Sequence, residues 1–368
     1  MTKAQEAKKK HATALMKLPN VVGVASGFKY RGGKRTDEEC VVVYVSKKVD
    51  RALLAFSDTI PGKVDLVQTD VIEVGEIRGP RPIPHAVAPG TPLTATPLEL
   101  THRERPSRCG NSLGHFKITA GTQGAVVRLA RDGELYVVTN NHVGADSNRG
   151  AIGDPILQPG PYDGGQVTDR VATLSDYVKI NFQGAKKKNN ALTRAWWKLF
   201  QAPANFGAAL VGCPFRLALR KALPQGVIEQ PDPNLVDVGL GKATDPVIVS
   251  PETVYLGHIT EIKGVQLGDT VIKVGRTTEK TEGIVEGVDA MITVSYGDAG
   301  TAVFDNQLVI RAKSGEFSAG GDSGSAIHRL KDGKYAWCGL LFAGSTDGRT
   351  FANRVEDLIA YLPAFMLA

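Results

Sequence analysis

Short segments in which apolar residues dominate or alternate with polar ones follow each other along most of the chain. Near the N-terminal end, two β-branched runs flank a turn at Gly32-Gly33, which predicts a β-hairpin. An Ala- and Lys-rich segment precedes the hairpin and is ended by Pro19-Asn20, so we expect a helix there. These elements predict a small α+β module over residues 1–78. They are a helix at 3–18, hairpin arms at 21–30 and 40–45, a short helix at 51–56 and a strand at 70–74.

From residue 109 onward, short apolar segments recur at regular spacing and are separated by glycine-rich turns. Many short strands with such turns are typical of an all-β barrel or sandwich. A helix at 355–365 is expected to end this domain. The expected strands are 124–129, 134–139, 171–174, 236–240, 259–261, 270–274, 283–288, 291–296, 307–311, 325–328 and 336–342.

Residues 79–108 interrupt the pattern, because seven of the twenty prolines fall between positions 79 and 106. Proline favours an extended, stiff backbone, so this stretch predicts a linker. It would join the N-terminal module to the domain at 109–368.

A second interruption, 182–226, carries eight Lys and Arg side chains and no Asp or Glu. Within it, 191–201 has Leu192, Trp196 and Leu199 near one helical face. One interpretation is a lid, or a helix that binds an acidic surface or a membrane. The other is a helical excursion whose tryptophans pack on the barrel and whose lysines face water.

The composition is that of a soluble globular protein, with 42% hydrophobic and 22% charged residues and a formal net charge of +6. The 41 glycines and 20 prolines among 368 residues favour turn-rich β structure. No segment predicts a transmembrane span or a secretory signal. The four cysteines lack the spacing of a disulfide framework or a zinc site. We therefore expect a cytoplasmic protein without a metal or cofactor.

The glycine-rich stretch Gly320-Gly321-Asp322-Ser323-Gly324 lies between two apolar segments, 307–310 and 337–342. Its glycines suit a tight turn that exposes the serine hydroxyl and leaves backbone N–H groups free to face a ligand. An ordinary hairpin turn has the same composition. A nucleophilic Ser323 therefore requires a base and an acid elsewhere in the chain.

The best candidates for the base and the acid are His142 and Asp237. His142 closely follows an apolar strand at 134–139, although a buried structural histidine would fit the same pattern. Asp237 starts the apolar strand at 236–240, where a carboxylate needs a donor such as a histidine Nδ1–H because burying it alone is costly. Asp176 is the alternative acid, with a solvent-facing strand end as its simpler interpretation.

Three motifs in the order His, Asp, Ser resemble the chymotrypsin/trypsin family of serine peptidases, especially its bacterial members without a secretory signal. The resemblance covers about residues 109–365 and implies a mainly β fold of two antiparallel, chymotrypsin-like β-barrels, preceded here by the α+β module. The matching strings are Thr139-Asn140-Asn141-His142, the strand that contains Asp237, and Gly321-Asp322-Ser323-Gly324-Ser325.

The same resemblance assigns roles to the motif residues. Ser323 would attack the scissile carbonyl, His142 would transfer the proton, and Asp237 would orient His142. The N–H groups of Gly321 and Ser323 would form the oxyanion hole. Asp322 would have a local structural partner, since the chain shows no cleavage site that would supply a new apolar N-terminus.

The family alignment on Ser323 also implies a specificity pocket. Phe317 would lie at its base, with Phe342, Ala343 and Gly344 on its wall. Because no carboxylate lies at that base, we expect uncharged, small-to-medium apolar residues before the cleaved bond.

The sequence thus predicts a serine endopeptidase that acts on intracellular protein or peptide substrates, with an N-terminal module that inhibits it or recruits targets. No nucleic-acid partner is expected, because no motif for one is present. Two alternatives remain: a catalytically silent binding scaffold on the same barrels, and a membrane-docking protein that uses 182–226.

Overall fold

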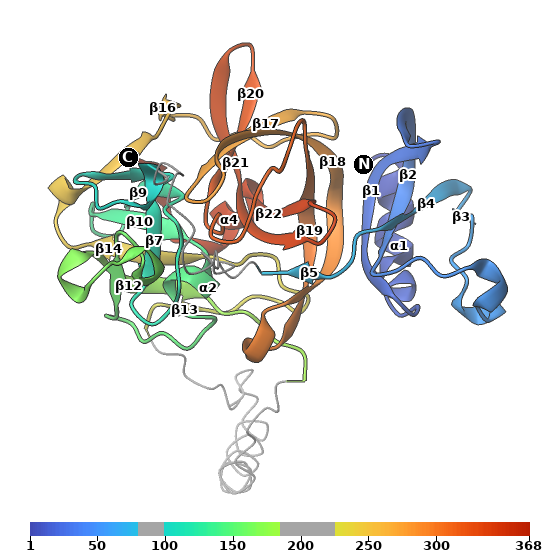
Figure 1. The fold of residues 1–368 in the computed structure, drawn as a ribbon, viewed down its shortest axis with the longest axis horizontal. Coiled ribbons are helices and arrows are strands. Elements are labelled where there is room, and N and C mark those ends of the chain that lie inside the picture. Colours follow the sequence, from blue (N-terminus) through green and yellow to red (C-terminus); the bar gives the residue numbers. More distant parts are fainter. Residues whose placement is uncertain (80–98, 185–224) are drawn as a thin grey trace, which may run out of the picture. The chain divides into compact units, whose positions relative to one another are not determined.

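The computed structural model describes residues 1–79, 99–184 and 225–368 (Figure 1). Most of the expected linker, the expected helix at 191–201 and nearly all of the basic insert lie outside these residues. Within the described part of the chain, no helix combines the length and the apolar character needed to cross a membrane.

The N-terminal residues form one helix on a small sheet. Thr2 caps α1 (Lys3–Leu15) in a capping box with Gln5, which satisfies otherwise unpaired N–H groups of the first turn. The helix packs on the strands β1 (Val21–Arg31) and β2 (Lys34–Val45). The sheet continues through β4 (Val67–Glu73) and β3 (Lys63–Val64).

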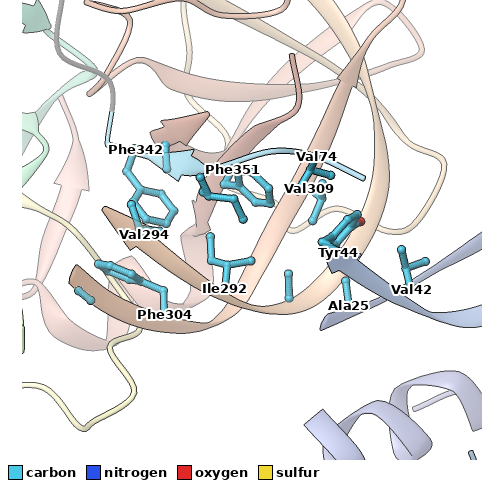
Figure 2. Close-up of a cluster of buried hydrophobic side chains, with 14 of the residues drawn as sticks. Ala25, Val42, Tyr44, Val74, Ile292, Val294, Phe304, Val309, Phe342 and Phe351 are labelled. Carbon is cyan, nitrogen blue, oxygen red and sulfur yellow. The ribbon is translucent and has the colours of Figure 1, made fainter. Parts of the chain in front are cut away.

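Residues 40–45 of β2 are buried on both faces of the strand, which explains their unbroken run of hydrophobic side chains. Val41 and Val43 belong to the cluster under α1, together with Ala7 and Leu15. The alternate residues Val42 and Tyr44 instead join a second cluster with residues of the C-terminal strands, such as Ile292 and Phe351 (Figure 2). Because successive side chains of a strand point to opposite faces, β2 packs on α1 with one face and on the C-terminal strands with the other.

Six strands in the C-terminal part close into an antiparallel barrel. They pair in the order β17-β20-β21-β22-β19-β18, and a β17–β18 pairing closes the ring. Its interior is filled by buried side chains such as Val271, Ile310, Phe317 and Leu341. The strands are β17 (Thr270–Gly275), β18 (Glu279–Ser295), β19 (Thr301–Ala312), β20 (Ala326–Lys331), β21 (Lys334–Ser345) and β22 (Thr350–Arg354).

The long strand β18 joins this barrel to the N-terminal sheet. Its first residues pair with β17, and its later residues pair with β1, as Gly23 with Ile292 and Gly27 with Gly287. The short strand β5 (Ile77–Arg78) pairs with β18 and β21. The N-terminal module is thus hydrogen-bonded into the sheet of the C-terminal barrel.

The middle part of the chain forms the other antiparallel barrel, with strands in the order β23-β9-β10-β14-β12-β11-β7-β8. Leu113, Val137, Ile156 and Leu174 are buried in its interior. A further cluster of buried hydrophobic side chains lies between the strands of this barrel and the C-terminal barrel. The strands are β7 (Ser112–His115), β8 (Gly121–Thr122), β9 (Ala125–Leu129), β10 (Leu135–Thr139), β11 (Pro155–Leu157), β12 (Arg170–Val178), β13 (Val227–Ile228), β14 (Gly239–Ala243) and β23 (Phe365–Leu367).

The remaining elements connect these sheets. A small third sheet joins β6 (Ser107–Cys109), β15 (Val249–Thr253) and β16 (Gly257–His258). The other helices are α2 (Asn141–Gly144) and α4 (Val355–Tyr361). Single 3-10 turns occupy Arg51–Leu53, Phe56–Asp58, Glu99–Thr101, Pro161–Asp163, Val167–Asp169, Pro246–Ile248 and Gly297–Ala299. The expected fold class, mainly β with two antiparallel barrels after a small α+β module, is confirmed.

Several expected element boundaries are wrong. The strand expected at 236–240 begins at Gly239, because side chains hold the Asp237 backbone: its N–H bonds Asn353 Oδ1 and its carbonyl accepts from Asn140. The strands expected at 283–288 and 291–296 are the single strand β18. Bulges interrupt the register of its pairing with β19, but the strand continues through them.

Two expected helices and one strand also differ. The helix expected at 51–56 is two separate 3-10 turns, because Leu54 and Ala55 are extended. The terminal helix stops at Tyr361, and the residues that follow pair as β23 with β9. Residues 259–261 lie beyond β16, so they form no strand of their own.

Candidate active site

His142 and Asp237 are in direct contact. His142 lies on the one-turn helix α2, directly after the buried strand β10, and Asp237 lies just before β14, the neighbour of β10. Nδ1 of His142 is 2.6 Å from Oδ2 of Asp237, and the His142 backbone N–H donates to Oδ1 at 3.2 Å. The carboxylate therefore fixes both the ring and the backbone of the histidine.

The surroundings of Asp237 are fully buried and polar. Its carboxylate has no exposed surface, and it accepts a third hydrogen bond, 2.7 Å long, from the hydroxyl of Tyr296. Its backbone is held by Asn140 and Asn353, and Asn353 is in turn held by Gln307. This network offsets the cost of burying the charge, because every carboxylate oxygen has a donor.

The alternative acid, Asp176, has a different partner. Both of its carboxylate oxygens bind the guanidinium of Arg131, at 2.8 and 2.6 Å. The structure thus brings Asp237, and not Asp176, together with His142.

Ser323 lies in the turn between β19 and β20, and its side chain is buried. Oγ of Ser323 and Nε2 of His142 are buried, and neither has a hydrogen-bond partner among the described residues. A buried polar atom without a partner is costly, so native proteins keep few of them. In enzymes without substrate, the hydrogen bond between a nucleophile and its base is often long and shortens only in the complex.

The turn that carries Ser323 is held by Thr122 of β8, in the barrel that also contains β10 and β14. The Thr122 N–H donates to the Ser323 carbonyl at 2.7 Å, and the Thr122 hydroxyl donates to the Gly321 carbonyl at 3.0 Å. Gly121 lies between this turn and α2: a Cβ added to it would be 2.8 Å from the Ser323 carbonyl oxygen and 2.6 Å from Val143. A glycine is therefore required there for the serine turn and the histidine helix to approach each other.

Gly321 adopts a left-handed backbone conformation with φ of 103°. A side chain there would also collide with Thr277 and Arg276. Among the described residues, the N–H groups of Gly321 and Ser323 have no acceptor. They are available to bind an oxyanion.

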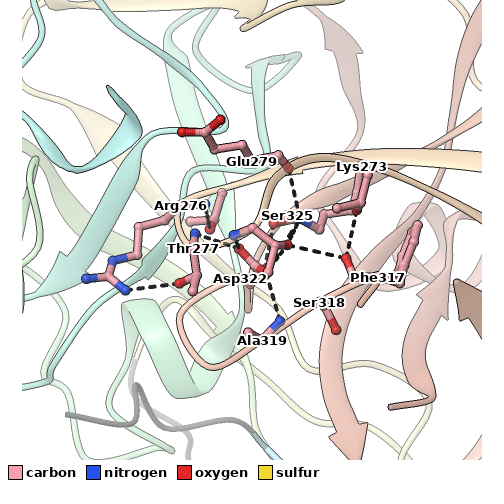
Figure 3. A network of polar contacts seen from close by, with 12 residues as sticks. Lys273, Arg276, Thr277, Glu279, Phe317, Ser318, Ala319, Asp322 and Ser325 are labelled. Atoms are coloured by element: carbon pink, nitrogen blue, oxygen red, sulfur yellow. Dashed lines mark hydrogen bonds and ion pairs between the residues drawn. The ribbon is translucent and has the colours of Figure 1, made fainter. Parts of the chain in front are cut away.

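Asp322 anchors the same turn from its other side (Figure 3). Its carboxylate accepts from the N–H groups of Thr277 and Ala319, at 2.8 and 2.9 Å, and from the Thr278 hydroxyl at 2.7 Å. The Lys273 ammonium lies 3.5 Å away, and both side chains are fully buried. Burial lowers the pKa of Lys273, and the nearby Asp322 carboxylate opposes that shift. Asp322 therefore has the local partner that the sequence predicts.

A cavity of about 420 Å³ opens beside His142. Tyr296 and Gly79 line it together with residues that follow β7 and residues in and after α2. The charged side chains on its walls are Lys117, Asp146, Arg149 and Asp298. The cavity brings both barrels and the end of the N-terminal module next to the candidate base.

The four residues expected to form a specificity pocket belong to the C-terminal barrel. Phe317 is fully buried inside the C-terminal barrel, and Phe342 is buried against Phe304, with ring centroids 4.8 Å apart. Ala343 is fully buried, and Gly344 pairs with Arg78 and Thr350. None of the four lines the cavity beside His142, so the preferred residue at the cleavage site stays a prediction.

Two residues of the site were missed by the sequence reasoning. Lys273 stands in the apolar segment 270–274, and a charged residue inside a buried strand is a signal that could have revealed it. Tyr296 directly follows β18 and carries no such signal, because a tyrosine at a strand end is ordinary. Within the described ranges, no group of three or more His, Cys, Asp or Glu side chains could hold a metal ion.

Comparison with known proteins gives matches to both parts of the chain. The family model described as the NARROW LEAF 1 N-terminal domain matches residues 7–71. Protease A of Thermobifida fusca is similar at 17% identity and a TM-score of 0.39, over 71% of this chain and 97% of that chain. A Nocardiopsis protease is similar at 14% identity and a TM-score of 0.38, over 68% and 94% of the two chains.

A chymotrypsin of Cellulomonas bogoriensis is similar at 13% identity and a TM-score of 0.37, over 70% of this chain and 98% of that chain. No curated protein sequence matches the chain significantly.

Proposed function

We propose that the chain is a chymotrypsin-type serine endopeptidase, in which Ser323, His142 and Asp237 form the catalytic triad. The observation that carries this proposal is the 2.6 Å contact between His142 and Asp237, with the free Nε2 on the other side of the ring. Histidine held in this way by a buried carboxylate presents Nε2 as a base. The glycine-rich turn supplies the serine on the other side of Gly121.

In the proposed reaction, Ser323 Oγ attacks the peptide carbonyl carbon and its proton passes to His142 Nε2. The N–H groups of Gly321 and Ser323 bind the resulting oxyanion. The C–N bond then breaks, and His142 gives the proton to the departing amine. Water repeats the sequence on the acyl-enzyme and releases the acid product. Asp237 stabilises the imidazolium in both halves.

We further propose that the N-terminal module restrains access to this site. Pairing of β20 with β21 ends at Leu340, and the Leu341 backbone bonds Gly324 and Ser325, so this side of β21 is left open beyond Leu341. The strand β5 occupies it: Arg78 pairs with Gly344, and Ile77 pairs with Ser345, both antiparallel. An extended peptide binds a sheet by adding to such an open edge, so β5 excludes a substrate from this one.

The proposed substrates are intracellular proteins or peptides. A reducing compartment agrees with the cysteines of the described residues, since Cys40, Cys109 and Cys338 are buried free thiols. A catalytically silent binding scaffold remains the alternative, although such a scaffold would not require His142 to contact Asp237 and to keep its Nε2 free.

A fluorophosphonate probe, which reacts only with an activated serine, tests the proposal on the full-length protein. The wild type should be labelled, and Ser323→Ala should not. Ser318→Ala is the matched control, because Ser318 lies in the same loop and its hydroxyl contacts Thr350 instead. An unlabelled wild type, or equal labelling of Ser323→Ala, would contradict the assignment.

A further inference from the structure

The hydroxyl of Tyr296 binds the same carboxylate oxygen that contacts His142. It is 2.7 Å from Oδ2 of Asp237, while Nδ1 of His142 is 2.6 Å from that atom. The other hydrogen-bond donor to the Asp237 carboxylate is the His142 backbone. Among the described residues, Tyr296 is therefore the one donor to this carboxylate that does not belong to His142.

Tyr296 also connects the two barrels at this point. It follows β18 of the C-terminal barrel directly, whereas Asp237 and His142 flank the paired strands β14 and β10 of the other barrel. The tyrosine hydroxyl therefore fixes the acid from across the boundary between the barrels. A carboxylate held from both sides cannot rotate away from the imidazole without losing a charge-assisted hydrogen bond.

Aromatic rings hold Tyr296 in place. Its ring lies edge-on to Phe182 with centroids 5.6 Å apart, and 6.2 Å from Phe304. The His142 ring packs on it from another side, with centroids 5.5 Å apart. Gly79 is close enough that a Cβ there would lie 2.9 Å from the tyrosine ring. The side chain thus has little freedom to turn its hydroxyl elsewhere.

The hydroxyl remains a donor across the working pH range. Burial, followed by the charge of Asp237, raises the pKa of Tyr296 well above its ordinary value. A tyrosine that keeps its proton next to a carboxylate donates that proton in the hydrogen bond, so the direction of the bond is fixed.

We infer that Tyr296 is a positioning residue of the proposed triad, which orients the Asp237 carboxylate toward His142 Nδ1. This inference rests on the proposed function, but its test can be read independently of it. The substitution Tyr296→Phe removes the hydroxyl and keeps the ring that packs on His142. Tyr44→Phe is the matched control, because Tyr44 is also fully buried and makes no contact with the triad.

Two readouts separate positioning from a general structural role. The first is the low-field proton resonance of the His142 Nδ1–H, which reports the hydrogen bond to Asp237 without any need for activity. It should shift or broaden in Tyr296→Phe and stay unchanged in Tyr44→Phe. The second is the rate of fluorophosphonate labelling, which should fall about tenfold in Tyr296→Phe and should not change in the control.

A double-mutant cycle completes the test. In an Asp237→Asn background, adding Tyr296→Phe should slow labelling no further, because the carboxylate that the hydroxyl orients is gone. An unchanged resonance in Tyr296→Phe, or fully additive effects in the cycle, would overturn the inference. Failure of the wild type to react with the probe would overturn the proposed function instead, and the proton resonance would then decide the role of Tyr296 alone.

Discussion

The ammonium group of Lys273 lies 3.5 Å from the carboxylate of Asp322, and neither side chain is exposed to solvent. Asp322 immediately precedes the proposed nucleophile, and Lys273 lies on β17, so this ion pair connects the serine turn to the barrel wall. Lys273 also donates to the carbonyl of Glu279 at 2.9 Å. The position of Ser323 thus depends on a buried charge pair.

Lys273→Met should destabilise the protein and disturb the serine turn. Removing one partner of a buried ion pair leaves the other charge without compensation, which costs about 3 kcal/mol of the free energy of unfolding. Urea unfolding measures this loss, and Lys280→Met, at an exposed position on the neighbouring strand, is the control. A loss below about 0.5 kcal/mol, as for a surface substitution, would contradict the prediction.

Asp237→Asn should nearly abolish labelling by the fluorophosphonate probe. An asparagine can no longer hold the histidine in the tautomer that leaves Nε2 free, so the rate should fall by about 10³-fold or more. Asp176→Asn is the matched control, because it breaks the ion pair with Arg131 and leaves His142 untouched. Equal effects of the two substitutions would disprove the choice of Asp237.

Weakening the strand β5 should open the site. Ile77 is buried, and Ile77→Ala removes much of the apolar contact that holds β5 against β21. If β5 excludes peptides, cleavage of a peptide library and labelling by a peptide-based phosphonate should become several-fold faster. Ile72→Ala is the control, since it trims the same apolar cluster from β4 without touching β5. A slower reaction would indicate that β5 supports the site.

The stability of the fold should fall in mild acid because of His328. This side chain is fully buried on β20 without a hydrogen-bond partner, and burial lowers its pKa to about 4. Its pKa is lower in the folded state, so the unfolded chain binds the proton more readily. The stability contribution is therefore complete above pH 6.5 and is lost progressively down to about pH 4, by about 3 kcal/mol.

Comparing the wild type with His328→Leu by urea unfolding at several pH values isolates this effect. Asp357, whose pKa burial raises to about 6, titrates in the same range with the opposite sign, but it is present in both proteins. The difference between their unfolding free energies should therefore change as the pH falls from 6.5 to 4. A constant difference would rule out the titration of His328.

Local patterns in the sequence predicted most of the strands and indicated the three residues that we propose as the triad. β-branched runs separated by glycine turns predicted a barrel or sandwich, and the resemblance to a peptidase family then specified two barrels. The need of a buried carboxylate for a donor favoured Asp237 over Asp176. The pairing of β1 with β18 could not be predicted, because Gly23 and Ile292 meet over a separation that no local periodicity encodes. The contact of Tyr296 with Asp237 was missed for the same reason, since it depends on how the two barrels meet.

Gly121→Ala should impair the proposed reaction more than it impairs folding. The added methyl group would lie 2.6 Å from Val143, next to the base, and 2.8 Å from the carbonyl oxygen of Ser323. Since both neighbours are tightly held, the methyl group must push the histidine helix and the serine turn apart. We expect labelling to slow at least about tenfold, with a destabilisation of about 1–3 kcal/mol. Gly62→Ala is the control, because a Cβ there meets no atom within 4 Å. Labelling of Gly121→Ala at the wild-type rate would show that the approach of these two elements does not set the reactivity of Ser323.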